Sequence, residues 1–259
     1  MEIQNLYLEM SRKCTLKCEH CCRGESQMIN ISEETLYNIF NNVKKIDVLL
    51  FTGGEPLVAM SELEKAIELI KNNKVEINEI RIVTNGTALN SRILKILKDL
   101  TEISKLVIKI SYDMFHLTEL ERLKIKEKRD HNIELLKEYF GATEFGKLQE
   151  NDITNKRLIT PIGRAKNLTE ERIKEINSLS EIEYSLSSFN NWIQPETYYK
   201  DNKVYGTIDI DVNGNVVSYG LSFEDEDKEA EKTGININKM DFKEAMISFS
   251  EYLVNKKIR

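Results

Sequence analysis

The 259-residue sequence predicts an α/β fold, a partial (β/α)6 TIM-like barrel followed by a small C-terminal α+β extension made of a hairpin and a helix. The first observation is that apolar, β-branched runs alternate with segments of helical spacing up to about residue 180. The second is that each of the first four runs ends in a polar or glycine-bearing loop. The pattern changes after residue 180. We therefore expect a barrel domain over residues 1–180 and an extension over 181–259, packed on the barrel mouth.

The alternating part contains five expected strands and four expected helices. The strands cover residues 6–10, 46–51, 80–84, 106–111 and, with a weaker pattern, 158–162. The helices cover residues 32–46, 61–73, 91–100 and a long charged stretch at 117–139. Ser32, Ser61 and Ser91 open the first three helices, as expected for capping residues.

The tail predicts a hairpin and a final helix. Residues on both sides of Asn213-Gly214 alternate between polar and apolar, and this dipeptide suits a type I′ turn, in which both positions have positive φ. An acidic run at 224–231 and a helix over 241–257 follow.

Composition limits the classes of protein to which this chain can belong. A hydrophobic content of 41% and a charged content of 31% are typical of a soluble globular protein, and no apolar run is long enough for a membrane helix. The first ten residues lack the pattern of a signal peptide, so we expect a cytoplasmic protein. A net charge of −6 argues against nucleic acid as a partner.

All four cysteines lie in the stretch "CTLKCEHCC". Cys14, Cys18 and Cys21 have the spacing Cys-x3-Cys-x2-Cys, and thiolates are ligands for iron-sulfur clusters and zinc. Three ligands on a four-iron cluster leave one iron free for a cofactor or substrate. The alternative is a zinc ion held by the three cysteines with His20 or Cys22. We interpret Cys22 as a neighbour packed beneath the loop.

The cysteine loop and the next strand end, "TGGEP", resemble the radical S-adenosylmethionine (radical SAM) superfamily. "TNGT" at residues 84–87 and "SYDMFH" at 111–116 occupy the places of the family's next strand ends, and "TPIGRAKN" resembles a turn of its peptide-modifying branches. The tail resembles the SPASM/twitch extension that carries auxiliary clusters, but Val217, Ser218 and Tyr219 stand where that module has a cysteine.

The resemblance implies one [4Fe-4S] cluster on Cys14, Cys18 and Cys21, with S-adenosyl-L-methionine (SAM) on the open iron. It implies cofactor contacts from eight residues: His20, Gly53, Gly54, Glu55, Pro56, Asn85, Ser111 and Asp113. The two glycines would let the backbone approach the methionyl ammonium, and Glu55 would accept from it. Pro56 would direct the turn, and His20 would lie near the adenine. Asn85, Ser111 and Asp113 would face the ribose or carboxylate.

Three of these eight residues also have a purely structural interpretation. Asn85 belongs to an ordinary turn signal, and Ser111 and Asp113 suit the cap of the next helix. Three arginines, Arg122, Arg129 and Arg164, could reach an anionic group, although arginines on helix faces are usually solvated.

The activity that the resemblance implies is reductive cleavage of SAM to a 5′-deoxyadenosyl radical, which abstracts hydrogen from a peptide or a small metabolite. A one-electron donor such as flavodoxin or ferredoxin would then be a partner. The alternatives are an activase that places a glycyl radical on a partner enzyme and a non-catalytic metal or redox module. On this interpretation, replacing Gly54 by Val should weaken SAM binding and leave the iron content intact.

Overall fold

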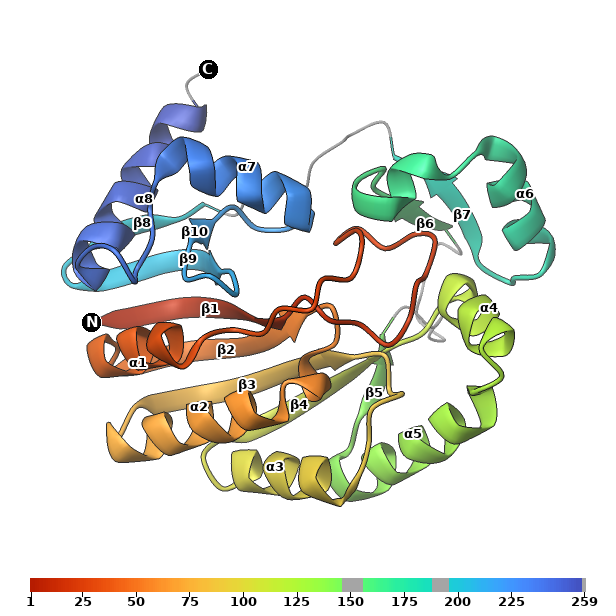
Figure 1. Ribbon diagram of the computed structural model, residues 1–259, viewed down its shortest axis with the longest axis horizontal. Helices are drawn as coiled ribbons and strands as arrows, with labels where there is room; N and C mark the ends of the chain where they lie inside the picture. The colour runs from red at the N-terminus through yellow and green to blue at the C-terminus, as the bar shows by residue number, and fades with distance from the viewer. Residues whose placement is uncertain (146–155, 188–195, 258–259) are drawn as a thin grey trace.

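A computed structural model of the chain describes residues 1–145, 156–187 and 196–257 (Figure 1). Within them, eight strands form the main sheet in the order β10-β9-β1-β2-β3-β4-β5, with β8 beside β9. The strands are β1 (Glu2–Ser11), β2 (Lys45–Gly53), β3 (Glu76–Thr84), β4 (Lys105–Ser111), β5 (Thr143–Phe145), β8 (Tyr198–Lys200), β9 (Lys203–Ile210) and β10 (Val216–Val217).

The first five strands are parallel to their neighbours, and helices connect them. The connecting helices are α1 (Glu33–Asn42), α2 (Met60–Asn72), α3 (Ser91–Thr101), α4 (Met114–Arg122) and α5 (Lys126–Phe140). Figure 1 shows α1, α2 and α3 along one face of the sheet, α5 beside β5, and α4 beyond the carboxyl ends of the strands. The expected α/β class is confirmed, and the arrangement is that of a partial TIM-like barrel.

The expected fifth strand, at 158–162, does not join the main sheet. It forms β6 (Lys156–Ile159), which pairs in parallel with β7 (Glu183–Leu186), and α6 (Glu170–Ser178) connects the two strands. This small unit has its own apolar cluster, which includes Ile159, Ala165 and Ile176, and it packs on Phe115 of α4.

One apolar core joins the sheet to its helices. Leu6 of β1 and Leu49 of β2 are fully buried in the same cluster as Phe40 of α1 and Phe249 of α8 (Phe242–Lys257). Alternate residues of a strand point to the same face. The apolar face of β1 that carries Leu6 therefore packs with helices from both halves of the sequence, α1 and α8.

The helix starts differ in part from the prediction. Ser32 caps α1 as expected, because its side chain accepts from the backbone N–H of Thr35. Ser61 lies within α2 and does not cap it, whereas Ser91 is the first residue of α3, as expected, but is not its cap. The 3-10 turn Pro56–Val58 leads directly into α2, which begins at Met60, and the side chain of Asn90 caps α3. Asn is as good a cap as Ser, and it comes one residue earlier.

The single long helix expected over 117–139 is two helices, α4 and α5. Lys124 has a φ of 58°, a left-handed conformation that ends α4. The break lets Leu120, Leu123 and Ile125 pack together against the cysteine loop at Leu16. Burial of these apolar side chains therefore compensates for the interruption of the helix.

The tail forms a hairpin with a different turn from the predicted one. Ile210 pairs with Val216, which leaves residues 211–215 in the connection, and of Asn213 and Gly214 only the glycine has positive φ. The type I′ prediction was therefore wrong. The Asp211 carboxylate holds the turn instead, because it accepts from the backbone N–H groups of Asn213 and Asn215.

A two-residue turn with positive φ at both positions occurs in the preceding hairpin. Lys200 of β8 pairs with Lys203 of β9, and Asp201 and Asn202 between them have φ of 48° and 62°. These two values are those of a type I′ turn.

The extension continues the main sheet, because β9 pairs in parallel with β1. The acidic run forms α7 (Phe223–Thr233), which Figure 1 shows above β9 and β10. The boundary proposed at residue 180 stays a prediction.

A buried cluster of charges fastens α7 to the end of β1. Arg12, 1% exposed, donates to Glu9 at 3.0 Å, to Asp211 at 3.4 Å and to Glu226 of α7 at 3.3 Å. Arg23 pairs with the same Glu9 and Glu226. The acidic residues of the tail therefore meet the two arginines that flank the cysteine loop.

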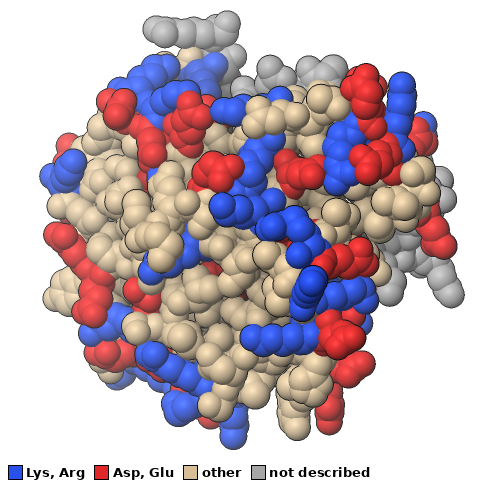
Figure 2. Space-filling model, turned by 45° about the vertical axis from the view of Figure 1, so that its right-hand side comes forward, with Lys and Arg blue, Asp and Glu red and all other residues tan. Residues whose placement is uncertain are grey.

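In the described part of the chain, the helices are too short or too polar to span a lipid bilayer. The face shown in Figure 2 carries basic and acidic side chains interspersed around an uncharged area. This mixture is typical of a solvated surface.

Candidate active site

Four neighbouring parallel strands bring their carboxyl ends to one edge of the sheet. Ser11, Gly53, Thr84 and Ser111 are the last residues of β1, β2, β3 and β4. The loop after β1, which carries all four cysteines, extends beyond this edge toward α4 and the β6–β7 unit (Figure 1). The polar loops identified in the sequence therefore meet, as parallel topology requires.

The three spaced cysteines lie in one protected loop. Cys18 is 5% exposed and packs with Leu16 and Leu120, and Cys14 borders the same cluster. Burial raises the pKa of the Cys14 thiol to about 11 and also raises that of Cys18. Buried thiols of this kind need a bound cation to ionise at neutral pH, which a metal cluster provides.

Three thiols in one loop suit an iron-sulfur cluster, because a cluster holds its ligands on separate irons. Among the described residues, a different set of three donor atoms lies within 4.8 Å of one another. It comes from His20, Asp113 and His116 and contains no thiol.

Gly53 and Gly54 are required by the packing of β2 on the cysteine loop. A Cβ at Gly53 would lie 2.1 Å from the carbonyl oxygen of Ser11, and one at Gly54 would lie 2.4 Å from that of Lys13. The backbone N–H of Gly54 donates to Ser11 at 2.7 Å. The structure thus shows a close approach of these glycines to the cysteine loop, and the predicted approach to the methionyl ammonium stays a prediction. A side chain at Gly54 would displace the backbone next to Cys14, contrary to the expected intact iron content.

Glu55 is fully buried and satisfied by protein donors. Its carboxylate accepts from the Thr84 hydroxyl at 2.7 Å, from the backbone N–H of Asn85 at 2.8 Å and from that of Leu57 at 3.2 Å. Burial raises the pKa of Glu55 to about 7. Glu55 therefore joins the ends of β2 and β3. Pro56, also buried, begins the 3-10 turn that follows.

Asn85 connects the end of β3 to the cysteine loop. Its side-chain nitrogen donates to the Thr15 hydroxyl at 3.0 Å and lies 3.7 Å from the sulfur of Cys14. Its side-chain oxygen accepts from the Thr87 backbone and hydroxyl. Gly86 has a φ of 78°, so the turn reading of this stretch is also correct. Asn85 orients the first cysteine as well as shaping the turn.

Arg129 is a positioning residue for which the sequence predicted a solvated side chain. It is 1% exposed and donates to the carbonyl oxygens of Ser111, at 2.9 Å, and Asn85, at 3.3 Å. Ser111 therefore takes part in the site through its backbone as the last residue of β4. Arg122, by contrast, is 60% exposed and pairs with Glu119, as expected for a helix face.

Asp113 caps α4 and joins two histidines. One carboxylate oxygen accepts from the backbone N–H of His116, and the other lies 2.7 Å from His116 Nδ1 and 3.1 Å from His20 Nε2. Burial acts to raise the pKa of Asp113, but the two imidazoles hold it well below its usual range. His20 also stacks on Phe115, with ring centroids 4.7 Å apart. The capping interpretation is correct for Asp113, whose side chain also orients His20, and wrong for Ser111, which ends β4.

Arg164, in the turn between β6 and α6, holds the cysteine loop. Its Nε donates to the carbonyl oxygen of Cys18, and its backbone N–H donates to that of Cys21, both at 2.9 Å. A Cβ at Gly163 would lie 2.3 Å from the carbonyl oxygen of Cys22. The "GRA" turn therefore packs directly on the backbone of Cys21 and Cys22, and its glycine was the only signal for this contact in the sequence.

Comparisons with known proteins agree with this geometry. The family model of the radical SAM superfamily matches residues 8–144, more than half of the chain. The putative peptide biosynthesis protein YydG of Bacillus subtilis (strain 168) is 25% identical over 132 residues, 48% of this chain and 40% of that protein. GTP 3′,8-cyclase of Clostridium perfringens (strain SM101 / Type A) is 33% identical over 145 residues, 51% of this chain and 42% of that protein. The chain thus spans less than half the length of these relatives.

A solved structure has a similar fold. Native anSMEcpe with bound AdoMet and Cp18Cys peptide superposes with a TM-score of 0.55 at 16% identity, over 95% of this chain and 80% of that one. The family match confirms the resemblance found in the motifs. The chain belongs to the radical SAM superfamily, whose enzymes use a [4Fe-4S] cluster and SAM.

Proposed function

We propose that this protein cleaves SAM reductively at a single [4Fe-4S] cluster and uses the product to abstract hydrogen from a peptide. The observation that supports this most directly is the position of the thiols. Cys14, Cys18 and Cys21 lie in one loop at the edge where the polar ends of β2, β3 and β4 meet. When bound, the cluster supplies an electron and SAM supplies the 5′-deoxyadenosyl radical.

Residues of the chain would hold these groups in defined places. The three thiolates would ligate three irons, and Cys22 would stay outside the cluster. The backbone at Gly53 and Gly54, supported by Glu55 and Pro56, would face the methionyl end of SAM. Because Glu55 already accepts three hydrogen bonds, it would act by positioning this turn.

Other residues would hold the rest of the cofactor. Asn85, Ser111 and Asp113 would border the ribose or the carboxylate, and His20 would lie near the adenine. His20 Nδ1 is buried and has no hydrogen-bond partner in the described part of the chain. That nitrogen is therefore free to bond to the cofactor.

Peptide substrates are supported by two of the similar proteins. One carries peptide biosynthesis in its name, and the other was solved with a bound peptide. The similarity to GTP 3′,8-cyclase supports a second candidate, a nucleotide substrate. The tail would cover the substrate without a cluster of its own, and a flavodoxin or ferredoxin would donate the electron.

The test is anaerobic reconstitution with iron and sulfide, followed by reduction and addition of SAM. We expect about four irons per chain and formation of 5′-deoxyadenosine. Cys18→Ala should abolish both, and the matched variant Cys22→Ala should retain both. Equal 5′-deoxyadenosine from Cys18→Ala and the unaltered protein would show that the proposal is wrong.

A further inference from the structure

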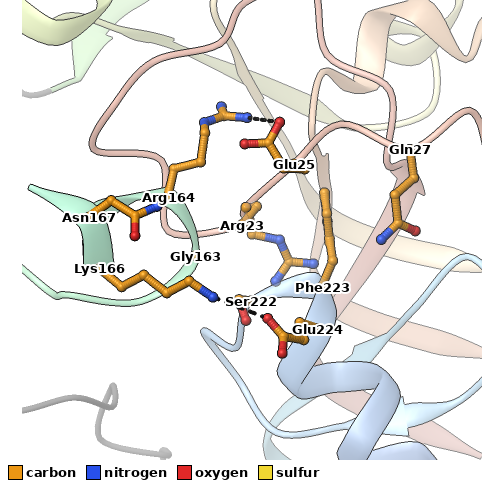
Figure 3. Close-up of a pocket in the computed structure, with 11 residues that line it drawn as sticks. Arg23, Glu25, Gln27, Gly163, Arg164, Lys166, Asn167, Ser222, Phe223 and Glu224 are labelled. Atoms are coloured by element: carbon orange, nitrogen blue, oxygen red, sulfur yellow. Dashed lines mark hydrogen bonds and ion pairs between the residues drawn. The ribbon is translucent and has the colours of Figure 1, made fainter.

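A cavity of about 180 Å³ lies where three distant segments meet. The segments are the end of the cysteine loop, with Arg23, the "GRA" turn, with Arg164 and Lys166, and the start of α7, with Ser222 and Phe223 (Figure 3). The Arg23 guanidinium lies 4.7 Å from the centre of the Phe223 ring. One wall is therefore apolar, and the others carry cationic side chains.

Two hydrogen-bond donors of this lining lack acceptors. Arg23 Nε and Arg164 Nη1 are buried, and neither has a hydrogen-bond partner among the described residues. The oxygen of Glu25 nearest Arg164 Nη1 is 3.7 Å away, and Glu25 is 72% exposed. Buried donors are nearly always satisfied in proteins, so two in the lining of one cavity indicate a missing acceptor.

The charges around the cavity limit a ligand to a single negative charge. Arg23 is already neutralised by Glu9 and Glu226, and Lys166 pairs with Glu224 at the rim. Arg164 Nη1 lies 3.7 Å from Glu25, a pair that solvent screens because Glu25 is 72% exposed. A carboxylate inside the cavity can therefore replace Glu25 beside Arg164, whereas a triphosphate would be repelled by the acidic side chains around the cavity.

The cavity adjoins the proposed reaction centre. Arg23 follows directly after Cys22, and Arg164 holds the carbonyl oxygens of Cys18 and Cys21. A group anchored here would therefore be held beside the loop that carries the cluster. The volume accommodates one small group and not a whole peptide, so the cavity suits an anchoring subsite.

We infer that Arg23 and Arg164 bind a carboxylate of the peptide substrate in this cavity. This inference rests on the proposed function for the identity of the substrate. The carboxylate could belong to the end of the peptide or to an acidic side chain. A carboxylate between the two arginines would accept one charge-assisted hydrogen bond from Arg23 Nε and one from Arg164 Nη1, and so would supply the missing acceptors.

The test is isothermal titration calorimetry on the anaerobic, iron-loaded protein without SAM. The probes are N-acetylglycine for a chain end, the α-methylamide of N-acetylglutamate for a side chain, and the neutral N-acetylglycinamide. We expect one of the acids to bind at least about ten-fold more tightly than the amide, and the preferred acid identifies the source. Inorganic triphosphate serves as the fourth probe and should bind more weakly than the preferred acid.

Variants place the binding in the cavity. Lys166→Glu, which reverses a charge at the rim of the cavity, and Arg164→Gln should each weaken binding of the preferred acid at least about ten-fold. Lys95→Glu, on the exposed face of α3, is the matched charge reversal and should change affinity less than about two-fold. The inference is wrong if the amide binds as well as both acids, if triphosphate binds more tightly, or if both cavity variants bind normally.

The outcome is independent of SAM cleavage. Because the titration contains no SAM, a protein that fails to form 5′-deoxyadenosine can still show binding of the acid. A protein that cleaves SAM but does not distinguish acid from amide would disprove the carboxylate site alone. Iron content measured on each variant shows whether Arg164→Gln has disturbed the cysteine loop.

Discussion

The backbone N–H of Asn85 donates a 2.8 Å hydrogen bond to the buried carboxylate of Glu55. This bond joins the ends of β2 and β3 directly beneath the cysteine loop, because the Asn85 side chain also reaches Thr15 and approaches Cys14. A single network thus connects three of the loops that the sequence singled out. The ionisation of Glu55 therefore affects the stability of the whole edge.

Glu55 should make stability depend on pH. Its pKa is about 7 in the folded protein, against an ordinary value of 4.5, so the folded state binds the proton more tightly. The stabilisation is complete below pH 4.5 and is lost as the pH rises to about 7, a change of about 3 kcal/mol. Urea unfolding of the unaltered protein and of Glu55→Gln should show their difference in unfolding free energy falling over this range. Asp209, whose pKa burial also raises, is present in both proteins and cancels. A constant difference would contradict the prediction.

Gly54→Ala should release iron. The added Cβ would lie 2.4 Å from the Lys13 carbonyl oxygen, so the backbone next to Cys14 must move. We expect iron per chain after reconstitution to fall by more than about half, because a ligand displaced by even 1 Å spoils a metal site. Gly141→Ala is the control, since its Cβ would contact nothing within 4 Å and its strain, from a φ of 62°, is confined to the end of α5. Full iron content in Gly54→Ala, with weaker SAM binding, would instead support the sequence-based expectation.

Arg12→Met should destabilise the fold strongly. The substitution removes the cation that Glu9, Asp211 and Glu226 share and leaves their carboxylates buried together. Breaking a buried ion pair in this way costs about 3–5 kcal/mol, which urea unfolding would measure. Lys95→Met, which removes an exposed pair with Asp99, should cost less than about 1 kcal/mol. If both variants lost a similar unfolding free energy, the buried cluster would stabilise the protein no more than an exposed ion pair does.

Asp113→Asn separates the two roles of this side chain. Asparagine can still cap α4 through one oxygen, so the unfolding free energy should change by less than about 0.5 kcal/mol. It removes the oxygen shared by His20 and His116, so equilibrium binding of SAM should weaken at least about five-fold. Unchanged SAM affinity would mean that Asp113 serves only as a cap. Asp113→Ala loses both roles, so it supplies the lower limit for the unfolding free energy and for the SAM affinity.

Local patterns in the sequence predicted the features that depend on neighbouring residues. Alternation of strands and helices predicted the parallel sheet, Ser32 predicted the first cap, and the spacing of Cys14, Cys18 and Cys21 predicted a cluster site. Each of these depends on interactions over a few residues or on the rule that parallel strands end together.

The features that the sequence did not predict depend on distant contacts. Arg129 lies in the charged stretch "KEKRDHN", where no periodicity marks it as buried, and its partners are 18 and 44 residues away. Arg12 meets Glu226 across 214 residues. The break at Lys124 follows from apolar packing on Leu16 rather than from a helix-breaking residue. Helix propensity and spacing carry no information on such contacts.

The pairing of β1 with both β2 and β9 limits the order in which the sheet can fold during synthesis. During synthesis β1 emerges first, and β2 follows about 40 residues later, but Lys203, the partner of Glu2 on the other side, comes some 200 residues afterwards. Until then one edge of β1 is unpaired and Arg12 lacks Asp211 and Glu226. A nascent chain that stops short of β9 therefore exposes an aggregation-prone strand edge and holds its cysteine loop loosely. We expect iron to be loaded only after β9 has been synthesised and has paired with β1.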